Sequence, residues 1–242
     1  MNSRDKAQRN RTETRASILA ALGALLAKSG FSTIGINAVA REAGVDKVLI
    51  YRYFGGLPEL LKAFAEETDF WPGIAELMQE AGEIRDESAP GERAKQIMLA
   101  FGRALRKRPL TQEIMRWELL ERNELTETLA RYREAQSEKL FEQFGESTGV
   151  DLRAMASLLA AGQAYLILRS KDADVYNGLS LHSETDWKRL EAAVGAILDA
   201  VFSHHVSQSN RSTMTSAKQT VTRPETKKAI RKKTKGKVDL EL

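Results

Sequence analysis

Residues 42–54, EAGVDKVLIYRYF, bring two cations and two tyrosines together just after a glycine. Lys47 and Arg52 can donate hydrogen bonds to an anion such as phosphate, and the hydroxyl groups of Tyr51 and Tyr53 can do the same. An ordinary structural explanation stays open, because tyrosines are often half-buried and surface cations are often only solvated. The choice depends on which of these side chains face outward.

A helix is predicted ahead of this stretch. Its apolar residues recur at helical spacing and are Ile18, Leu22, Leu25, Leu26 and Phe31. Gly30 marks its end. Residues 1–14 are polar and basic and lack this period, so we expect them to form a flexible basic arm.

Two short helices complete the predicted unit. The first of them carries the apolar residues Ile36, Val39, Ala40 and Ala43. It follows Gly35 and ends at Gly44, the residue type best able to adopt a left-handed conformation. Asp46 is placed to cap the next helix. With Val45, Ile50 and Phe54 turned inward, several other side chains of that helix must face outward, which is typical of a helix-turn-helix.

Residues 31–64, FSTIGINAVAREAGVDKVLIYRYFGGLPELLKAF, resemble the DNA-binding domain of the TetR family of transcriptional repressors. The matching features are a helix ending in AGV, a recognition helix with Tyr51 and Phe54, and a following helix with two leucines. The resemblance covers residues 15–64. It implies that the chain binds double-stranded DNA and that its DNA-binding residues are Thr33, Asn37, Lys47, Val48, Leu49, Tyr51, Arg52 and Tyr53.

The sequence departs from the family pattern at several of these positions. Val48 and Leu49 stand where the family often has a small residue and a threonine, and apolar side chains favour contact with a thymine methyl group. Tyr53 replaces the usual histidine and still offers a hydroxyl to a phosphate. Leu57 replaces the usual lysine, which removes one cationic contact, and the N–H groups at the start of that helix are a partial substitute.

Charge is distributed unevenly along the 242 residues. Residues 1–60 contain nine Lys or Arg against five Asp or Glu, residues 61–205 contain 18 against 25, and residues 206–242 contain ten against three. Basic ends suit a polyanionic partner and the acidic middle does not. There are no cysteines, and the longest uncharged stretch is the 15 residues 154–168, too short to span a bilayer. We therefore expect a cytoplasmic protein.

The motifs of the common enzyme classes are missing from the sequence. It has no Gly-x-Ser-x-Gly turn, no phosphate-binding glycine loop and no HExxH helix. Its histidines are His182, His204 and His205, and the last two are expected at the frayed end of the final helix. We expect no catalytic residue, no metal site and no cofactor.

Two later helices offer a dimerisation surface. Apolar faces occur in DLRAMASLLAAGQAYLILRS and in SETDWKRLEAAVGAILDAVF, where Ser183 and Asp186 fit a capping box. Two such helices from each subunit would make a four-helix interface, as in most members of the family, whereas burial within one subunit is the alternative. The predicted interface residues are Leu159, Gly162, Tyr165, Leu190, Val194 and Ile197.

The predicted fold class is all-α, with an N-terminal three-helix DNA-binding domain and a larger helical ligand-binding and dimerisation domain. The expected segments are a flexible arm (1–14), the helix-turn-helix domain (15–57), the regulatory and dimerisation domain (58–205) and a disordered basic tail (206–242). The family implies a small, mostly apolar effector. The predicted pocket residues are Phe101, Trp117, Tyr132 and Tyr165.

Two functions remain open at this point. The first is a homodimeric, ligand-responsive repressor acting on a palindromic operator, and the second is a ligand-independent DNA-binding or architectural protein. The cations of KKAIRKKTKGK in the tail suit DNA or an anionic membrane surface equally, or serve only to solubilise the chain. A peripheral membrane protein anchored by the tail is a third, weaker alternative.

Overall fold

The computed structural model describes residues 3–82, 90–143 and 150–221, with side-chain surroundings for 8–82, 91–143 and 150–204. The described fold is helical apart from one small hairpin, as the sequence predicts. By its internal contacts the chain divides into a compact unit, Met1–Phe202, and a second unit, Ser203–Leu242.

Four N-terminal helices form a unit that we call the head: α1 (Ser3–Ser29), α2 (Ile36–Ala43), α3 (Lys47–Phe54) and α4 (Leu57–Glu67). The predicted glycine turn is confirmed, because Gly44 ends α2 at φ 66° and ψ 32°. The predicted cap is confirmed as well, since the Asp46 carboxylate accepts the N–H of Val48 at 2.8 Å. Gly35 precedes α2 as its backbone cap and no side chain caps that helix.

Helix α1 is longer than the sequence predicted. Helical backbone begins at Ser3, where a flexible arm over residues 1–14 was expected. Residues 8–13 are all exposed, so this part of the helix buries nothing that an apolar period could have indicated. Arg9 binds Glu13 one turn away at 2.8 Å, a pair that supports a solvated helix.

One hydrophobic core joins the head to the helices beneath it. It contains Ile18 and Leu22 of α1, Ile50 of α3 and the fully buried Ile114 and Leu129 of later helices. Helices α1 and α4 approach closely at Gly23, where an added Cβ would lie 2.9 Å from the ring of Phe64. This contact makes glycine a packing requirement at residue 23.

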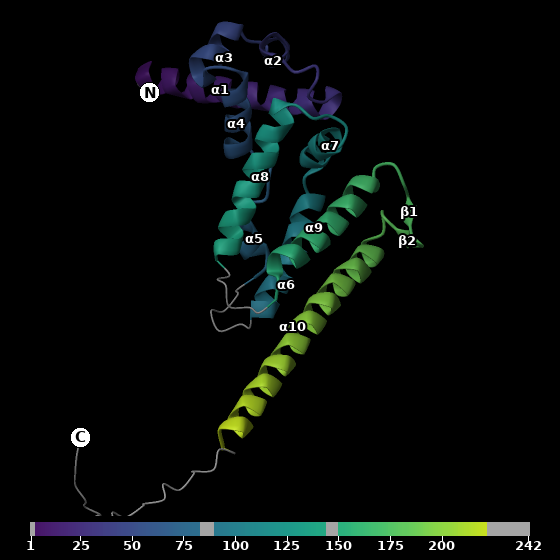
Figure 1. Cartoon of the computed structure of the whole chain (residues 1–242). Helices are drawn as coiled ribbons and strands as arrows, with labels where there is room; N and C mark the ends of the chain where they lie inside the picture. The colour runs from purple at the N-terminus through teal and green to yellow at the C-terminus, as the bar shows by residue number, and fades with distance from the viewer. Residues whose placement is uncertain (1–2, 83–89, 144–149, 222–242) are drawn as a thin grey trace, which may run out of the picture. The chain divides into compact units, whose positions relative to one another are not determined.

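The remaining elements follow the head (Figure 1): α5 (Ile74–Glu80), α6 (Pro90–Arg106), α7 (Pro109–Glu118), α8 (Glu124–Glu142), α9 (Leu152–Arg169), β1 (Val175–Tyr176), β2 (Leu179–Ser180) and α10 (Glu184–Val221). Helix α8 packs on α4 and helix α9 packs on α6. Strands β1 and β2 pair antiparallel, with Val175 opposite Ser180. Asn177 and Gly178 turn the hairpin with φ values of 49° and 79°.

Helix α10 starts as predicted and ends later than predicted. The Ser183 hydroxyl accepts the N–H of Asp186 at 3.3 Å, which is half of the expected capping box. The helix then continues to Val221, so His204 lies within it and not at its frayed end. The expected disordered tail from 206 is therefore helical up to Val221, and its basic run at 227–237 lies outside the described residues.

A membrane span is not found among the described helices, since none of them is both long enough and apolar enough.

Candidate DNA-binding surface and helix groove

Helix α3 divides its side chains between the core and solvent. Ile50 and Phe54 are buried, whereas Val48 is 62 % exposed and Tyr51 is 54 % exposed. Lys47 and Arg52 are also exposed. Leu49 and Tyr53 are half-buried, and Tyr53 packs partly against the head core. A large apolar side chain and a tyrosine that face solvent on a capped two-turn helix form a contact surface for a groove-shaped partner.

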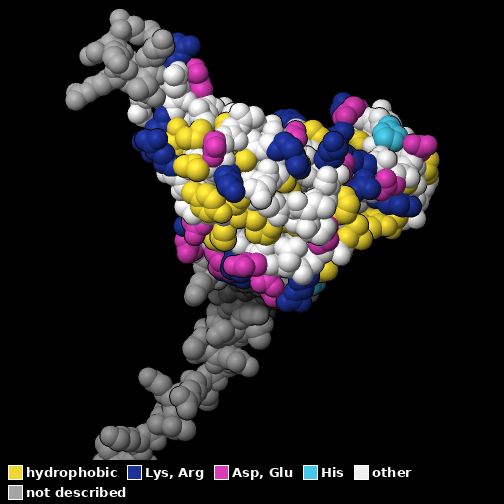
Figure 2. Space-filling model, turned by 90° about the horizontal axis from the view of Figure 1, so that it is seen from above, with side chains coloured by type: hydrophobic (Ala, Val, Ile, Leu, Met, Phe, Trp, Pro, Cys, Tyr) yellow, Lys and Arg dark blue, Asp and Glu magenta, His cyan; other side chains and the backbone are white. Residues whose placement is uncertain are grey.

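The other two predicted DNA-contact residues, Thr33 and Asn37, precede α3 in the sequence. Thr33 is exposed in the loop before α2, and Asn37 is exposed in the first turn of α2. Figure 2, which views the molecule from above, shows cations, acidic groups and hydrophobic side chains mixed over that side of the molecule. The surface therefore offers both hydrogen-bond donors that can bind phosphate and apolar side chains.

Arg15 of α1 fixes the C-terminal end of α3. Its guanidinium donates to the backbone carbonyl of Tyr53 at 3.0 Å and to Glu67 of α4 at 2.9 Å, and it lies 4.3 Å from the centre of the Phe54 ring. The hydrogen bond to Glu67 raises the pKa of Arg15 and lowers the pKa of Glu67. One arginine thereby ties three helices of the head together.

The end of α7 and the turn after it hold the loop between α1 and α2. The Glu121 carboxylate accepts the N–H groups of Phe31 at 3.1 Å and Ser32 at 2.7 Å. The Trp117 indole N–H donates to the Ala27 carbonyl at 3.3 Å. Gly30, at φ 70°, fits under both side chains, because a Cβ there would lie 2.4 Å from Glu121 Oε1. We call Trp117 and Glu121 the α7 clamp.

The other end of α7 is tied to the loop after α4. Arg108 is 7 % exposed and pairs with Asp69 and Glu76. Its guanidinium also donates to the Ala104 carbonyl at 2.9 Å. Helix α7 is therefore attached at both ends. One end is bound to the head, and the other is bound to the start of α5 and to the end of α6.

A buried ion pair lies between α7 and α8. Glu118 and Arg133 approach to 2.6 Å, with only 11 % and 17 % of their side chains exposed. Burial raises the pKa of Glu118, and the hydrogen bond from Arg133 offsets this only in part. The Arg133 guanidinium also lies 5.5 Å from the centre of the Trp71 ring.

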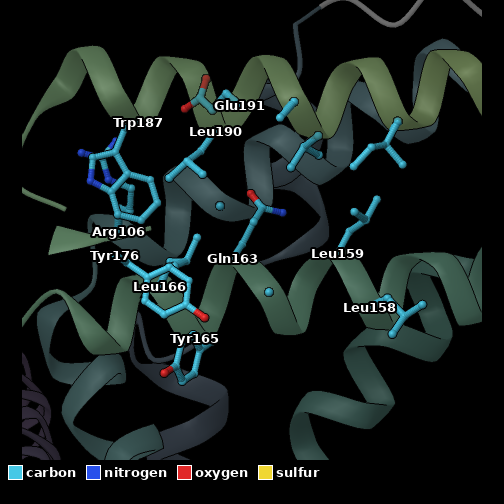
Figure 3. A pocket seen from close by; sticks show the side chains of 15 residues that line it. Arg106, Leu158, Leu159, Gln163, Tyr165, Leu166, Tyr176, Trp187, Leu190 and Glu191 are labelled. Carbon is cyan, nitrogen blue, oxygen red and sulfur yellow. The ribbon is translucent and has the colours of Figure 1, made fainter. Parts of the chain in front are cut away.

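An apolar groove separates α9 from α10 (Figure 3). It encloses about 290 Å³, and we refer to it as the α9–α10 groove. Its rim carries exposed apolar side chains, with Leu158 at 77 %, Tyr165 at 52 % and Ile197 at 48 %. All six residues predicted for the dimer interface line it: Leu159, Gly162, Tyr165, Leu190, Val194 and Ile197.

Few polar groups reach this groove. Arg106 and Glu191 line its α6 and α10 sides, and Glu191 is held by Arg103 at 2.9 Å. Gln163 of α9 lies against Gly102 of α6, where an added Cβ would be 2.1 Å from the amide oxygen. The groove is thus apolar with a narrow polar margin, which suits a hydrophobic occupant.

The four residues predicted to line a ligand pocket do not line the α9–α10 groove together. Phe101 packs on Trp71 with ring centres 5.7 Å apart, whereas Trp117 and Tyr132 both pack against the core that joins the head to the later helices. Tyr165 alone of the four lines the α9–α10 groove. The rings of Phe64, Phe70, Trp71 and Phe101 contact one another in sequence at tilted angles.

A second apolar cavity, lined by residues of α6, α8, α9 and α10, holds about 60 Å³, which is too small for an organic ligand. Among the side chains that the structure describes, no group of three or more His, Cys, Asp or Glu is placed to hold a metal ion.

The comparisons with known proteins agree with this geometry. Residues 18–64 match the family model described as bacterial regulatory proteins, tetR family. No curated protein matches the chain.

Several solved structures share the fold. A TetR family transcription regulator from Marinobacter aquaeolei is 18% identical, covers 80% of this chain and 97% of its own, and has a TM-score of 0.57. NalD of Pseudomonas aeruginosa, described as the secondary repressor of the MexAB-OprM multidrug efflux pump, is 20% identical with coverages of 76% and 95% and a TM-score of 0.56. A putative TetR-family regulator from Rhodococcus sp. is 19% identical with coverages of 78% and 99% and a TM-score of 0.52.

Proposed function

We propose, from the premise that this chain is a DNA-binding transcriptional regulator of the TetR family, that it acts as a homodimeric repressor of a palindromic operator. A small, mostly apolar ligand then releases it from that operator. The family is a group of regulators and not of enzymes, so the side chains of the head serve binding and not catalysis.

The outward face of α3 carries this proposal. Lys47, Arg52 and the hydroxyl groups of Tyr51 and Tyr53 donate to DNA phosphates, which position the helix and supply most of the affinity. Val48, 62 % exposed, is then free to meet a thymine methyl group in the major groove, with Leu49 beside it. Such a helix selects sequence largely through apolar contact.

A second copy of the chain supplies the operator symmetry. One recognition helix reads too few base pairs for useful selectivity, whereas two copies related by a two-fold axis read half-sites about 34 Å apart. The α9–α10 groove is the surface on which we place the second copy, because its rim exposes Leu158, Tyr165 and Ile197 in one chain. Packing α9 and α10 of two chains together covers these side chains.

The ligand-responsive part of the proposal is supported by the family match and by the α7 clamp, since the α9–α10 groove is taken up by the second copy. The clamp connects the lower helices to the loop before α2 through Glu121 and Trp117. A ligand bound below the head acts on DNA binding only through such connections.

One observation favours the ligand-independent alternative. Three of the four predicted pocket residues, Phe101, Trp117 and Tyr132, pack against other parts of the core and do not line the α9–α10 groove. In that case α9 and α10 only dimerise, and the chain is an architectural or constitutive DNA-binding protein. A panel of mostly apolar compounds that leaves the operator affinity unchanged would support this alternative.

Selection of bound duplexes from a random DNA pool by the full-length protein tests the leading proposal. We expect a palindrome whose half-sites are centred about one helical turn apart. Lys47→Ala and Tyr51→Ala should each weaken binding to the selected duplex by about tenfold, since each removes a contact worth about 1.4 kcal/mol. Arg153→Ala is the matched control, because Arg153 is an exposed cation of α9, and it should leave binding unchanged. An asymmetric consensus, or unaltered affinity in the α3 variants, contradicts the proposal.

A further inference from the structure

Arg11 of α1 lies against the recognition helix. Its guanidinium carbon is 5.6 Å from the centre of the Tyr53 ring, and its side chain is exposed. Among the described side chains Arg11 has no carboxylate partner. An arginine stacked on a tyrosine keeps its N–H groups directed outward, because the ring occupies only the flat face of the guanidinium.

Two neighbouring arginines of the same helix are engaged differently. Arg15, one turn later, is bound to the Tyr53 carbonyl and to Glu67, so it is already satisfied and fixes α1 against α3. Arg9, about half a turn away around the helix, is paired with Glu13 at 2.8 Å. Among the α1 side chains that the structure describes near α3, Arg11 is therefore the cation with unused hydrogen-bonding capacity.

We propose that Arg11 and Tyr53 together form a phosphate-binding pair that extends the DNA contact from the helix-turn-helix onto α1. The Arg11 guanidinium donates to one DNA phosphate, and the Tyr53 hydroxyl donates to the same or the adjacent phosphate. The contact is independent of base sequence. This inference rests on the proposed function of α3 and adds to it a residue that lies ahead of the helix-turn-helix.

Helix α1 continues beyond the Arg11–Tyr53 pair towards the N-terminus. Helical backbone extends from Arg11 back to Ser3, about 12 Å at 1.5 Å per residue. Figure 1 shows this N-terminal end of α1 running past α3. Arg15 anchors this segment, since it ties the following turn to α3 and α4.

The salt dependence of DNA binding tests the pair directly. The full-length protein is titrated against a fluorescent mixed-sequence duplex of about 30 base pairs at several salt concentrations. Each phosphate neutralised by the protein contributes about 0.9 to the slope of log affinity against log salt. We expect Arg11→Gln to reduce that slope by about 0.9 and to weaken binding about eightfold at about 0.1 M salt.

Arg9→Gln is the matched control, because it removes the same charge from the same helix on the side away from Tyr53. Its slope should stay at the wild-type value. Arg11→Lys keeps the charge and should retain the slope. In a Tyr53→Leu background, which removes the ring that supports Arg11, we expect Arg11→Gln to change the slope by less than in the wild type.

The outcomes separate three explanations. Equal slopes for Arg11→Gln and Arg9→Gln overturn the proposal, because general charge then explains both. A lower melting temperature of Arg11→Gln with an unchanged slope also overturns it, because the stacked pair then only stabilises the head. A wild-type protein that binds neither this duplex nor any duplex selected from the random pool would refute the proposed function itself, which distinguishes that failure from this one.

Discussion

The head and the α9–α10 groove complete their hydrophobic cores in different ways. In the head, Ile18, Leu22 and Ile50 are fully buried within one chain, and exposed apolar groups are concentrated on α3. Along the groove, Leu158 and Ile197 face solvent from two different helices. One chain therefore buries the core of the head by itself, whereas the groove leaves apolar side chains exposed, as the proposed dimer requires.

A substitution at Gly162 gives the largest expected effect and tests whether the groove is unfinished. A Cβ at this position would meet no atom within 4 Å in a single chain, so Gly162→Gln leaves room for folding. Between two packed copies the same side chain overpacks the interface and buries an unpaired amide. These costs together reach about 4 kcal/mol, or about 1,000-fold in the dimer dissociation constant.

Sedimentation equilibrium measures this change. Ala135→Gln, on the exposed face of α8, adds a side chain of the same kind away from the groove and should leave the dimer intact. A Gly162→Gln protein that remains a dimer would place the interface elsewhere.

A pair of glycines, Gly30 and Gly44, tests whether the α7 clamp packs tightly against the head. Gly30→Ala meets two penalties, a positive φ of 70° and a collision with Glu121 and Trp117, and should cost about 3 kcal/mol of unfolding free energy. Gly44→Ala has a similar φ of 66° with no atom within 4 Å of the new Cβ, and should cost about 1 kcal/mol. Urea unfolding at fixed protein concentration compares them. Equal losses would mean that the α7 clamp is loose.

The smallest expected effect concerns the pH dependence of stability near the head. Burial raises the pKa of Glu118 above 4.5, so the folded state holds this proton more tightly than the unfolded state does. Stability from Glu118 is therefore present below pH 4.5 and is lost as the pH rises through the folded pKa. Glu118→Gln stays neutral and should gain in unfolding free energy relative to the wild type over that interval.

Glu138→Gln gives the opposite sign. The hydrogen bond from Arg153 lowers the pKa of Glu138, so the wild type gains stability over this variant as the pH rises from the folded pKa towards 4.5. Urea unfolding across the acidic range measures both differences. A pH-independent difference for Glu118→Gln would show that the Glu118–Arg133 pair is not buried in solution.

The sequence predicts the elements whose signals are local. Gly44 and Asp46 mark the turn and the cap of the helix-turn-helix because each acts on its own backbone neighbours. The start of α1 was missed, because its exposed residues carry no apolar period. The hairpin was missed too, although Asn177 and Gly178 form the dipeptide typical of a tight turn.

Contacts between residues far apart in the chain could not be predicted from the sequence. Glu121 reaches the N–H groups of Phe31 and Ser32 across about 90 positions, and nothing in the local pattern marks it. Aromatic residues at helical spacing indicated packing for Phe101, Trp117 and Tyr132 but could not show that Phe101 packs against a different part of the core from the other two. The six residues predicted for the dimer interface lie together along the α9–α10 groove, because they recur on one face of each helix; their role at an interface stays a prediction.

The close approach of α1 and α4 at Gly23 constrains how a signal can travel. With the Phe64 ring seated where a larger residue would have its side chain, the two helices cannot slide or turn against each other without losing that contact. The four N-terminal helices should accordingly tilt as one rigid block. Under the function proposed above, release from DNA then requires a change in the separation between two such blocks, while the shape of each block stays the same.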